Sequence, residues 1–469
     1  MKTFRWNGLD EAGRAAALAR PEQRSDPSLQ ASVRAIVEDV RERGWAGLAA
    51  QALRIDDALP RRLPVAPAAA RARALLAPEQ VAALELAARN IRIFHESSLP
   101  ADQSVETMPG LLVRKVWRPI DRVGLYIPGG KTPLFSTLLM LAIPARAAGV
   151  GELVVTTPPD RNDGGLDPLL ALAAELCGID SIWTAGGAQA IAALAFGAAA
   201  LPRVDKICGP GNAWVAEAKK LVSSMPGGAA IDLPAGPSEL LVIADDSADA
   251  AMVAADLLSQ AEHDASAQVL LVTPSLAIAE AVEAEVARQV ATIPRRSFAE
   301  ASLAEARIIL AGDLPESVEI ANLYAPEHLS LAVVDADALV PAVRNAGAVF
   351  AGHLAAETFG DYLAGSSHVL PTDGAARAWS GVSVYSFQKA MSVQTVTAQA
   401  ARAIAAPAAA LARLEGLEAH ARAADARLIP LPAREGLGVG AAEGGHFPEP
   451  EGSLRSPPTP APSLAGRGG

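Results

Sequence analysis

Residue types that bind metals recur at a few polar points of an otherwise apolar chain. Gln260 and His263 lie three residues apart in DLLSQAEHDAS, so a helix there projects both side chains from one face. Asp361 follows a strand-like run in ETFGDYLAG, and His420 lies in LEGLEAHARAA. Nitrogen and oxygen ligands without a thiolate fit zinc or another divalent ion that keeps positions open for substrate. For Gln260 and His263 alone, a polar helix end is the simpler interpretation.

An adjacent acid and base occur in NLYAPEHLSL. Glu327 and His328 follow Pro326, which ends the preceding helix, and they come just before an apolar strand. A carboxylate beside an imidazole can orient it, and each group can move protons near neutral pH. Adjacent Glu and His are common by chance, but a loop in the same α/β region as the metal-like helix end favours catalysis. His368 in GSSHVLPT is a second candidate for a substrate contact.

Three glycine-containing turns could hold a nucleotide, although no GxGxxG follows a strand. They are LYIPGGKTP with Tyr126, SIWTAGGAQ with Gln189, and CGPGNAWV with Asn212. Glycine lets the backbone approach a ligand closely, and the N-terminus of the following helix favours phosphate. Because all three turns follow strands, we expect them along one edge of a parallel sheet, where nucleotides bind. A purely structural turn remains the default for any one of them.

Alternating apolar strands and helices must position these groups. The strand-like runs of residues 121–236 are RVGLYIP, ELVVTT, SIWTA, VDKICG and AAIDL. Those of residues 237–383 are ELLVIA, QVLLVT, ARIIL, LSLAVV and AVFAG. Strands separated by helices are typical of parallel, doubly wound sheets. We therefore predict an α/β fold with two Rossmann-like domains, joined at PAGPSE, in which the first serves a nucleotide and the second the metal and the acid–base pair.

The remaining segments are assigned from their composition. Residues 1–120 read as helical and are expected to pack with the second α/β domain. Residues 384–430 are expected to form an Ala-rich helical arm. Residues 431–469 are dominated by Gly, Pro and Ser, and we expect them to be disordered.

Composition excludes several classes of protein. With 469 residues, 51% of them apolar, the chain can bury a sizeable core. A net charge of −12 argues against nonspecific nucleic-acid binding. Only Cys177 and Cys208 are present, which implies no disulfide framework and favours a reducing compartment. Because neither a signal peptide nor an apolar run of membrane-spanning length occurs, we expect a cytoplasmic protein that binds no membrane.

Together these segments resemble the histidinol dehydrogenase family. From about residue 110 to 425 the resemblance runs, in the family's order, through LYIPGGKTPLFSTLLMLAIPA, AGGAQAIAALAFG, CGPGNAWVAEAKKLV, IDLPAGPSELLVIAD, LLSQAEHD, YAPEHL, FGDYLAGSSHVLPT and LEGLEAH. Several long motifs in one order are far more specific than any one of them. The first hundred residues fit only by helical character, and residues after 430 have no counterpart.

The resemblance implies the last step of histidine biosynthesis, in which L-histidinol is oxidised to L-histidine with NAD and one zinc ion per subunit. The implied zinc ligands are Gln260, His263, Asp361 and His420. The implied acid–base pair is Glu327 and His328. The implied substrate site comprises Ser238, Gln260, His263, His328, Asp361, Glu415 and His420. The implied NAD contacts are Tyr126, Gln189 and Asn212.

The resemblance also implies a homodimer whose C-terminal arms are exchanged. Glu415 and His420 would then complete the partner's site. Because residues five apart do not share a helix face, we expect Glu415 at the start of the last helix and His420 one turn in. Two features depart from the family pattern. Lys131 stands in the PGGKTP turn, where a small residue is expected, and a Pro-rich tail follows the arm.

The implied chemistry is a four-electron oxidation through an aldehyde, with two NAD molecules. His328 would remove the hydroxyl proton, Glu327 would activate the water that adds to the aldehyde, and zinc would anchor the substrate's imidazole and amine. An alternative forms a thiohemiacetal on Cys208, but a buried strand cysteine is the preferred interpretation. Two alternative functions remain. One is a dehydrogenase of the same fold that acts on another polyol or amino alcohol. The other is a non-catalytic metal- or nucleotide-binding protein, and the acid–base pair argues against this second alternative.

Overall fold

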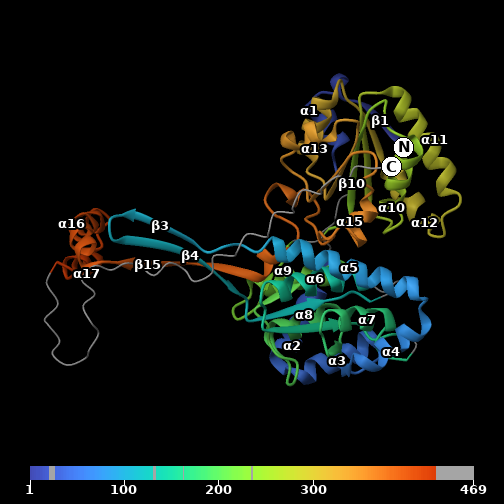
Figure 1. Ribbon diagram of the computed structural model, residues 1–469. Coiled ribbons are helices and arrows are strands. Elements are labelled where there is room, and N and C mark those ends of the chain that lie inside the picture. The colour runs from blue at the N-terminus through green and yellow to red at the C-terminus, as the bar shows by residue number, and fades with distance from the viewer. Residues whose placement is uncertain (21–26, 130–133, 162, 234–235, 429–469) are drawn as a thin grey trace, which may run out of the picture. The chain divides into compact units, whose positions relative to one another are not determined.

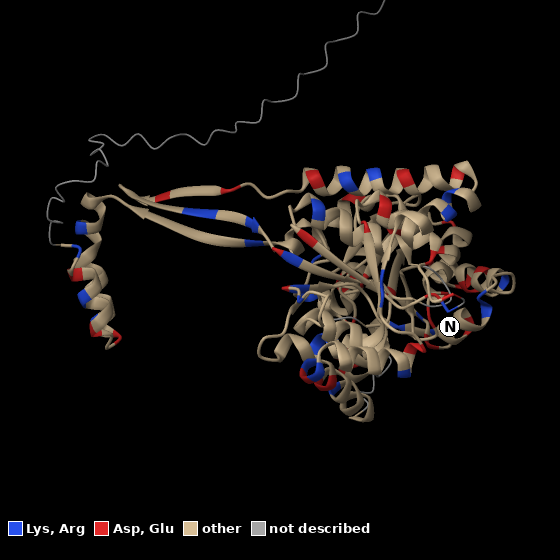
Figure 2. Cartoon of the chain, turned by 90° about the horizontal axis from the view of Figure 1, so that it is seen from below, with Lys and Arg blue, Asp and Glu red and all other residues tan. Residues whose placement is uncertain are grey.

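The computed structural model describes residues 1–20, 27–129, 134–161, 163–233 and 236–428 (Figure 1). The chain divides into a larger unit, Met1–Val105 with Val113–Val393, and a smaller unit that joins Glu106–Leu112 to the region from Gln394. No helix among the described residues has both the length and the apolarity needed to cross a membrane. Acidic and basic residues are interspersed along the helices in the view of Figure 2.

The first six-stranded sheet has the order β2-β7-β6-β5-β8-β9. Its strands are β2 (Arg62–Pro64), β5 (Arg122–Tyr126), β6 (Glu152–Thr157), β7 (Ser181–Thr184), β8 (Lys206–Cys208) and β9 (Ala230–Ile231). All neighbours are parallel except β2, which is antiparallel to β7. The connecting helices are α6 (Phe135–Ala147), α7 (Pro168–Leu176), α8 (Gly187–Phe196) and α9 (Ala213–Ser224). Strand order reverses at β5, as in a Rossmann-like sheet.

The second six-stranded sheet has the order β1-β12-β11-β10-β13-β14 and is parallel throughout. Its strands are β1 (Lys2–Arg5), β10 (Glu239–Ala244), β11 (Gln268–Thr273), β12 (Arg307–Leu310), β13 (His328–Ala332) and β14 (Ala348–Ala351). Its helices are α1 (Glu11–Ala17), α10 (Ala250–Ala261), α11 (Leu276–Val290), α12 (Arg296–Glu305), α13 (Leu314–Tyr324), α14 (Ala336–Leu339) and α15 (Glu357–Tyr362). From β10 onward the strand order repeats that of the first sheet, which confirms the predicted α/β fold with two Rossmann-like parts.

The N-terminal helices correct one prediction. Helices α2 (Pro27–Arg43), α3 (Trp45–Asp56), α4 (Ala66–Leu75) and α5 (Pro78–Ser97) pack on the helices of the first sheet: α2 and α3 on α8, α4 on α7, and α5 on α6. Val33 and Ile36 of α2 share an apolar cluster with Ala188 and Ala192 of α8. The predicted packing of residues 1–120 with the second domain is therefore wrong for α2, α3 and α4, whereas α5 also contacts that domain, because Asn90 donates a 2.8 Å hydrogen bond to the Leu363 carbonyl. Only the start of the chain joins the second sheet, where β1 pairs with β12.

Five strands fall in regions that we expected to be helical: β1 and β2, which are edge strands of the two large sheets, and three that form a sheet of their own. Strands β3 (Gln103–Met108), β4 (Leu111–Pro119) and β15 (Gln388–Val396) form a sheet of order β15-β4-β3. They mix Val and Thr with charged residues and are mostly exposed, so they lack the apolar runs that reveal buried strands. Helices α16 (Ala398–Leu414) and α17 (Glu418–Asp425) follow, as predicted for the arm.

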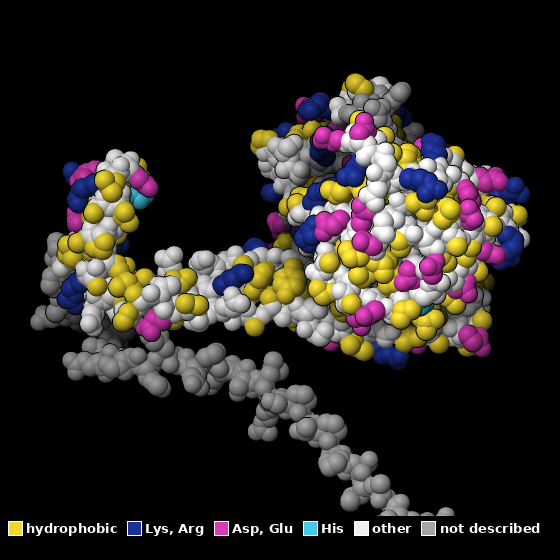
Figure 3. Space-filling model, turned by 90° about the horizontal axis from the view of Figure 1, so that it is seen from above, with side chains coloured by type: hydrophobic (Ala, Val, Ile, Leu, Met, Phe, Trp, Pro, Cys, Tyr) yellow, Lys and Arg dark blue, Asp and Glu magenta, His cyan; other side chains and the backbone are white. Residues whose placement is uncertain are grey.

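The arm helices carry apolar side chains that nothing in the described chain covers. Leu411 is 65% exposed, Leu414 84% and Leu417 42%. Apolar side chains are visible on this part of the chain in Figure 3. A contiguous exposed apolar face is typical of a surface that meets another protein. The predicted disordered tail, residues 431–469, lies outside the described residues.

Candidate active site

A cavity of about 230 Å³ is lined by residues that follow strands of the first sheet and by residues at the starts of strands of the second sheet. Gly209 follows β8 of the first sheet, whereas Ser238 immediately precedes β10 and His328 begins β13. The cavity thus meets the carboxyl end of one sheet and the amino ends of strands in the other. Six of the predicted site residues line it: Ser238, His263, Glu327, His328, Asp361 and His368.

His328 is buried, and its hydrogen bonding fixes the tautomer of its ring. Its Nδ1 lies 3.1 Å from the carbonyl oxygen of Glu239. Because a carbonyl can only accept, Nδ1 carries the proton and Nε2 keeps its lone pair. Nε2 has no hydrogen-bond partner and lies 3.8 Å from Asp361 Oδ1. Burial lowers the pKa of His328 to about 3, so the ring is neutral near pH 7 and can accept a proton through Nε2.

Glu327 is buried beside it, held by the same backbone residue. Its Oε2 accepts a hydrogen bond of 2.8 Å from the N–H of Glu239. Burial raises the pKa of Glu327 well above its usual range, and the nearby charges of Glu239 and Asp361 raise it further. The predicted loop position needs one refinement, because His328 is already the first residue of β13.

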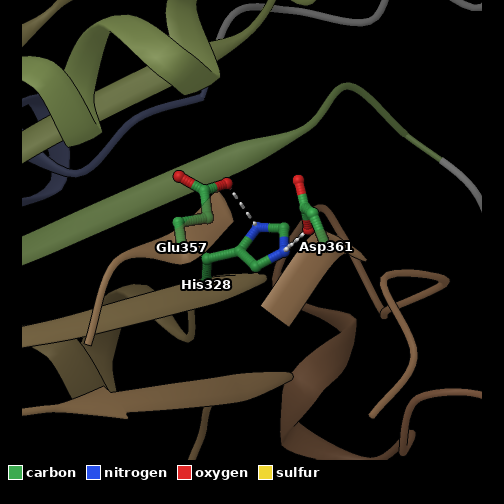
Figure 4. Close-up of side chains that lie close together, drawn as sticks. All are labelled: His328, Glu357 and Asp361. Carbon is green, nitrogen blue, oxygen red and sulfur yellow. Dashed lines mark ion pairs between the residues drawn. The ribbon is translucent and has the colours of Figure 1, made fainter. Parts of the chain in front are cut away.

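Glu357 is a site residue that the sequence reasoning missed. Figure 4 shows Glu357 and Asp361 at the two nitrogens of the His328 ring. Glu357 Oε1 lies 3.5 Å from His328 Nδ1, and burial raises the pKa of Glu357 well above its usual range. The three side chains offer ligand atoms within 4.8 Å of one another. A signal was available, because the four-residue spacing in ETFGD places Glu357 and Asp361 on one helix face.

The predicted metal ligands Gln260 and His263 meet as their spacing implied. Gln260 is the penultimate residue of α10, and its Nε2 lies 3.3 Å from His263 Nδ1 in the turn that follows. The Oε1 atom of Gln260 is buried without a partner. An unpaired buried amide oxygen is costly, and a bound cation would satisfy it. Together with Asp361, whose pKa burial raises to about 6, this donor set of nitrogen and oxygen atoms fits a divalent ion.

A second cavity, of about 810 Å³, lies along the carboxyl ends of β5 and β6 and the turns after β7 and β8. Tyr126 and Asn212 line it, in agreement with the edge predicted for the glycine turns. The Tyr126 hydroxyl accepts a hydrogen bond of 3.1 Å from Gly187, whose φ is +60°. Asn212 caps α9 by accepting hydrogen bonds from the N–H groups of residues 214 and 215. Residues 130–133 of the first turn, including Lys131, lie outside the described residues.

Gln189 does not itself line the second cavity, but it hydrogen-bonds to a residue that does. Its side chain is fully buried in α8 and donates a 3.0 Å hydrogen bond to Asp56, which lines the cavity. Its Oε1 has no hydrogen-bond partner among the described residues.

Cys208, the alternative nucleophile, is buried at the end of β8, and burial raises the pKa of its thiol far above the usual range. A thiol held neutral in this way is a poor nucleophile.

Glu415 and His420 both belong to the smaller unit. Glu415 is the C-terminal cap of α16 and not, as predicted, the start of the last helix. Gly416, with φ of +75°, breaks the chain there, and α17 begins at Glu418. His420 lies in the first turn of α17 and is exposed. The contribution of Glu415 and His420 to an active site remains a prediction.

Comparison with known proteins gives one consistent result. The histidinol dehydrogenase family model matches residues 18–428. Histidinol dehydrogenase of Xanthomonas oryzae pv. oryzae is 48% identical over 429 residues, 91% of this chain and 99% of the relative. That of Vibrio vulnificus is 43% identical over 435 residues, 92% of this chain and 100% of the relative.

A solved structure gives the same result for the fold. The crystal structure of histidinol dehydrogenase from Elizabethkingia anophelis matches with a TM-score of 0.87 and 39% identity, covering 91% of this chain and 98% of the other. The family model thus spans most of the chain, and its relatives match over nearly their whole length. This chain belongs to the histidinol dehydrogenase family of NAD-dependent oxidoreductases.

Proposed function

We propose that the chain oxidises L-histidinol to L-histidine in two hydride transfers, through the aldehyde, with two NAD molecules and a zinc ion at the cavity. The observation that carries this proposal is the buried His328 ring, whose tautomer leaves Nε2 unpaired beside Asp361. A neutral imidazole in that position can take the hydroxyl proton as hydride leaves the carbinol carbon. Glu357 and Asp361, on either side of the ring, would stabilise the imidazolium that results.

Glu327 is proposed to act in the second half of the reaction. The aldehyde must add water before it can lose a second hydride, and Glu327 lines the same cavity as His328. A carboxyl with a raised pKa can remove a proton from water and later return it. The Glu239 N–H holds one oxygen of this carboxyl and so fixes its orientation toward the cavity.

We propose that Gln260, His263 and Asp361 hold the zinc, together with His420 of a second copy of the chain. Zinc would supply a Lewis acid that anchors the imidazole and amine of the substrate. Ser238 lines the cavity at the start of β10 and is placed to contact the substrate, as Glu415 of the second copy would be. This dimer is supported by the resemblance and by the uncovered leucines of the arm.

NAD is proposed to occupy the second cavity, against Tyr126, Gln189 and Asn212. This cavity lies at the carboxyl ends of the first sheet's strands, where nucleotides bind in such folds. A cytoplasmic location is proposed because both cysteines are free and buried.

The decisive experiment counts the NADH formed per histidinol consumed. Two NADH per histidinol are expected, whereas a dehydrogenase for another polyol or amino alcohol would give one or none.

His328→Gln should lower the rate of NADH formation by about 10²- to 10⁴-fold, the usual contribution of a general base. The matched control is His353→Gln, because His353 is a partly exposed histidine that contacts Ser247. Full activity in His328→Gln would refute the proposed base.

Zinc titration of variants distinguishes two possible sets of zinc ligands, the proposed set with His263 and the cluster with His328 and Glu357. Asp361 belongs to both sets. The proposed set predicts that His263→Ala loses zinc affinity while Glu357→Gln retains most of it. If the cluster of His328, Glu357 and Asp361 holds the ion instead, Glu357→Gln loses the affinity and His263→Ala keeps it. Competition against a chromogenic chelator measures both.

A further inference from the structure

Arg20 reaches the second sheet from the end of the N-terminal segment. Its Nε and one terminal nitrogen donate to the two carboxylate oxygens of Glu239, at 2.5 and 2.9 Å. The same nitrogen donates to the carbonyl of Tyr324 at 2.9 Å, and the guanidinium lies 4.0 Å from the centre of the Tyr324 ring. The Glu239 side chain is 3% exposed and that of Arg20 17%. This two-pronged geometry is specific to arginine.

Glu239 is the residue whose backbone holds both proposed catalytic side chains. Its N–H donates to Glu327 Oε2 at 2.8 Å, and its carbonyl accepts from His328 Nδ1 at 3.1 Å. One of its carboxylate oxygens also accepts from the N–H of Asp373, at 3.0 Å. A shift of Glu239 along β10 would therefore move the hydrogen-bond partners of Glu327 and His328 together.

Buried polar residues on neighbouring strands hold the segment that carries Arg20. Arg307, the first residue of β12, donates to the carbonyl of Ala17 at 3.0 Å. Gln268, the first residue of β11, donates to the carbonyl of Ala19 at 3.2 Å. The segment before Arg20 is thus held against the amino ends of the sheet at two separate points, so the loss of one contact leaves the other in place.

We propose that Arg20 is a positioning residue for the reaction. It fixes the Glu239 carboxylate and, through the Tyr324 carbonyl, the chain three residues before Glu327. It thereby holds Glu327 Oε2 in place and keeps the His328 proton on Nδ1. The inference rests on the proposed roles of Glu327 and His328. It differs from a purely stabilising role because it predicts a change in the ring of His328, which Arg20 does not touch.

The test compares Arg20→Met with Arg307→Met as a matched control. Both variants remove a guanidinium that holds the same segment, but only Arg20 contacts Glu239. Arg20→Met should lower kcat by about 10- to 100-fold, the usual penalty for a misplaced catalytic group, while KM for NAD stays within about twofold. Arg307→Met should lower the melting temperature and leave kcat within about twofold of wild type.

Nitrogen-15 NMR of histidine-labelled protein gives a readout that does not depend on turnover. Wild type should show the His328 ring protonated on Nδ1, with its signal assigned from the His328→Gln spectrum. Arg20→Met should mix the two tautomers, and Arg307→Met should not. Arg20→Lys, which keeps the charge but not the two-pronged geometry, should give an intermediate kcat. If Arg20→Met fails to fold, Arg20→Lys and Glu239→Gln make the same comparison.

Coupling between Arg20 and Glu239 completes the experiment. If Arg20 acts through Glu239, the double variant Arg20→Met/Glu239→Gln should lose no more kcat than the worse single variant. An unchanged His328 tautomer and kcat in Arg20→Met, with only a lower melting temperature, would overturn the inference and leave the proposed function intact. Absence of NADH formation by the wild type would refute the proposed function instead, while the tautomer comparison would still report on positioning.

Discussion

Glu327 is a carboxyl group whose ionisation is suppressed in the folded chain. Burial is the largest cause of its raised pKa, and the N–H of Glu239 opposes part of the effect. The carboxyl can therefore exchange a proton with water at a pH where an ordinary glutamate would stay ionised. Only the second half of the proposed reaction requires this exchange.

Glu327→Gln should consequently separate the two half-reactions. With the aldehyde supplied directly, NADH formation should fall by about 10²- to 10⁴-fold, because the glutamine cannot take a proton from water. Reduction of the same aldehyde by NADH consumes no water and serves as the internal control, which should retain most of its rate. Equal losses in both directions would show that Glu327 does not act on water.

His95 of α5 should make the folded state sensitive to acid. The ring is fully buried, neither nitrogen has a hydrogen-bond partner, and burial lowers its pKa to about 4. The unfolded chain, with a histidine pKa of about 6.5, binds more protons between these values. The stability contribution is therefore present above about pH 6.5 and is lost as pH falls toward 4.

His95→Leu should flatten this dependence. Between pH 6.5 and 5 the free energy of unfolding should fall by about 2 kcal/mol less in the variant than in the wild type, at about 1.4 kcal/mol per pH unit. Urea unfolding at the two pH values measures the difference. His353→Leu, which removes a partly exposed histidine, should change this difference little. Parallel pH profiles for wild type and His95→Leu would contradict this account.

At the scale of elements, the second sheet presents polar residues at the first positions of its strands. Glu239, Gln268, Arg307 and His328 begin β10 to β13, and all are buried. Strand starts in a parallel sheet leave N–H groups free of ladder partners, and Glu327 uses one of them. The general expectation for doubly wound sheets, a site beyond the carboxyl ends, holds for the first sheet and is reversed in the second.

The sequence predicted strands where burial produces continuous apolar runs. ELVVTT and QVLLVT coincide with β6 and β11, because strands covered on both faces are apolar throughout. Exposed strands such as β15 carry no such run, so their sequence pattern does not distinguish them from helix. The apolar stripes of α2 to α5 indicated helices but not which sheet they cover, because a stripe encodes burial and not its partner.

The candidate site was predictable wherever its chemistry is local. Gln260 and His263 share a helix end, and Glu327 and His328 are adjacent in sequence. The part played by Glu239 was not predictable, since it acts through its backbone and depends on strand register. The identity of the substrate was likewise not predictable from the spacing of residues, because no spacing pattern distinguishes a site that binds an imidazole. It rests on the family resemblance.

A buried ion pair holds the glycine turn after β8. Lys219 of α9 pairs with Asp232 and donates to the Gly209 carbonyl at 2.8 Å, while Asp232 accepts from the Gly209 N–H at 2.7 Å. Gly209 has a φ of +131°, and a side chain there would collide with the Tyr126 carbonyl. The pair therefore fixes both backbone groups of a residue that lines the first cavity and packs against Tyr126, which lines the second.

Lys219→Met should be strongly destabilising. It leaves the Asp232 carboxylate buried without its cation, and such changes cost about 3 to 5 kcal/mol. Chemical denaturation measures the loss, and Lys220→Met on the exposed face of the same helix is the control. KM for NAD should rise in Lys219→Met because the turn loses its support. A stability within about 0.5 kcal/mol of wild type, the range of ordinary surface substitutions, would contradict the expected role.

At the scale of the whole molecule, the proposed exchange of arms predicts complementation. His328→Gln and His420→Ala should each be nearly inactive as homodimers. Mixed dimers would contain one site in which His328 and the donated His420 are both intact. Random mixing should then restore about a quarter of wild-type activity, as expected for a twofold dimer. If each arm serves its own chain, mixing should restore nothing.

The pairing of β1 with β12 has a consequence for how the protein is made. Lys2 lies opposite Arg307, so the first strand leaves the ribosome some three hundred residues before its partner exists. Such long-range pairing is slow to form. During refolding, Trp45 and Trp183 on the first sheet's side should become ordered before Trp6, which is buried against the second sheet. Enzymatic activity should return with the slower Trp6 signal, because the second sheet, which carries His328, is complete only once β1 has paired with β12.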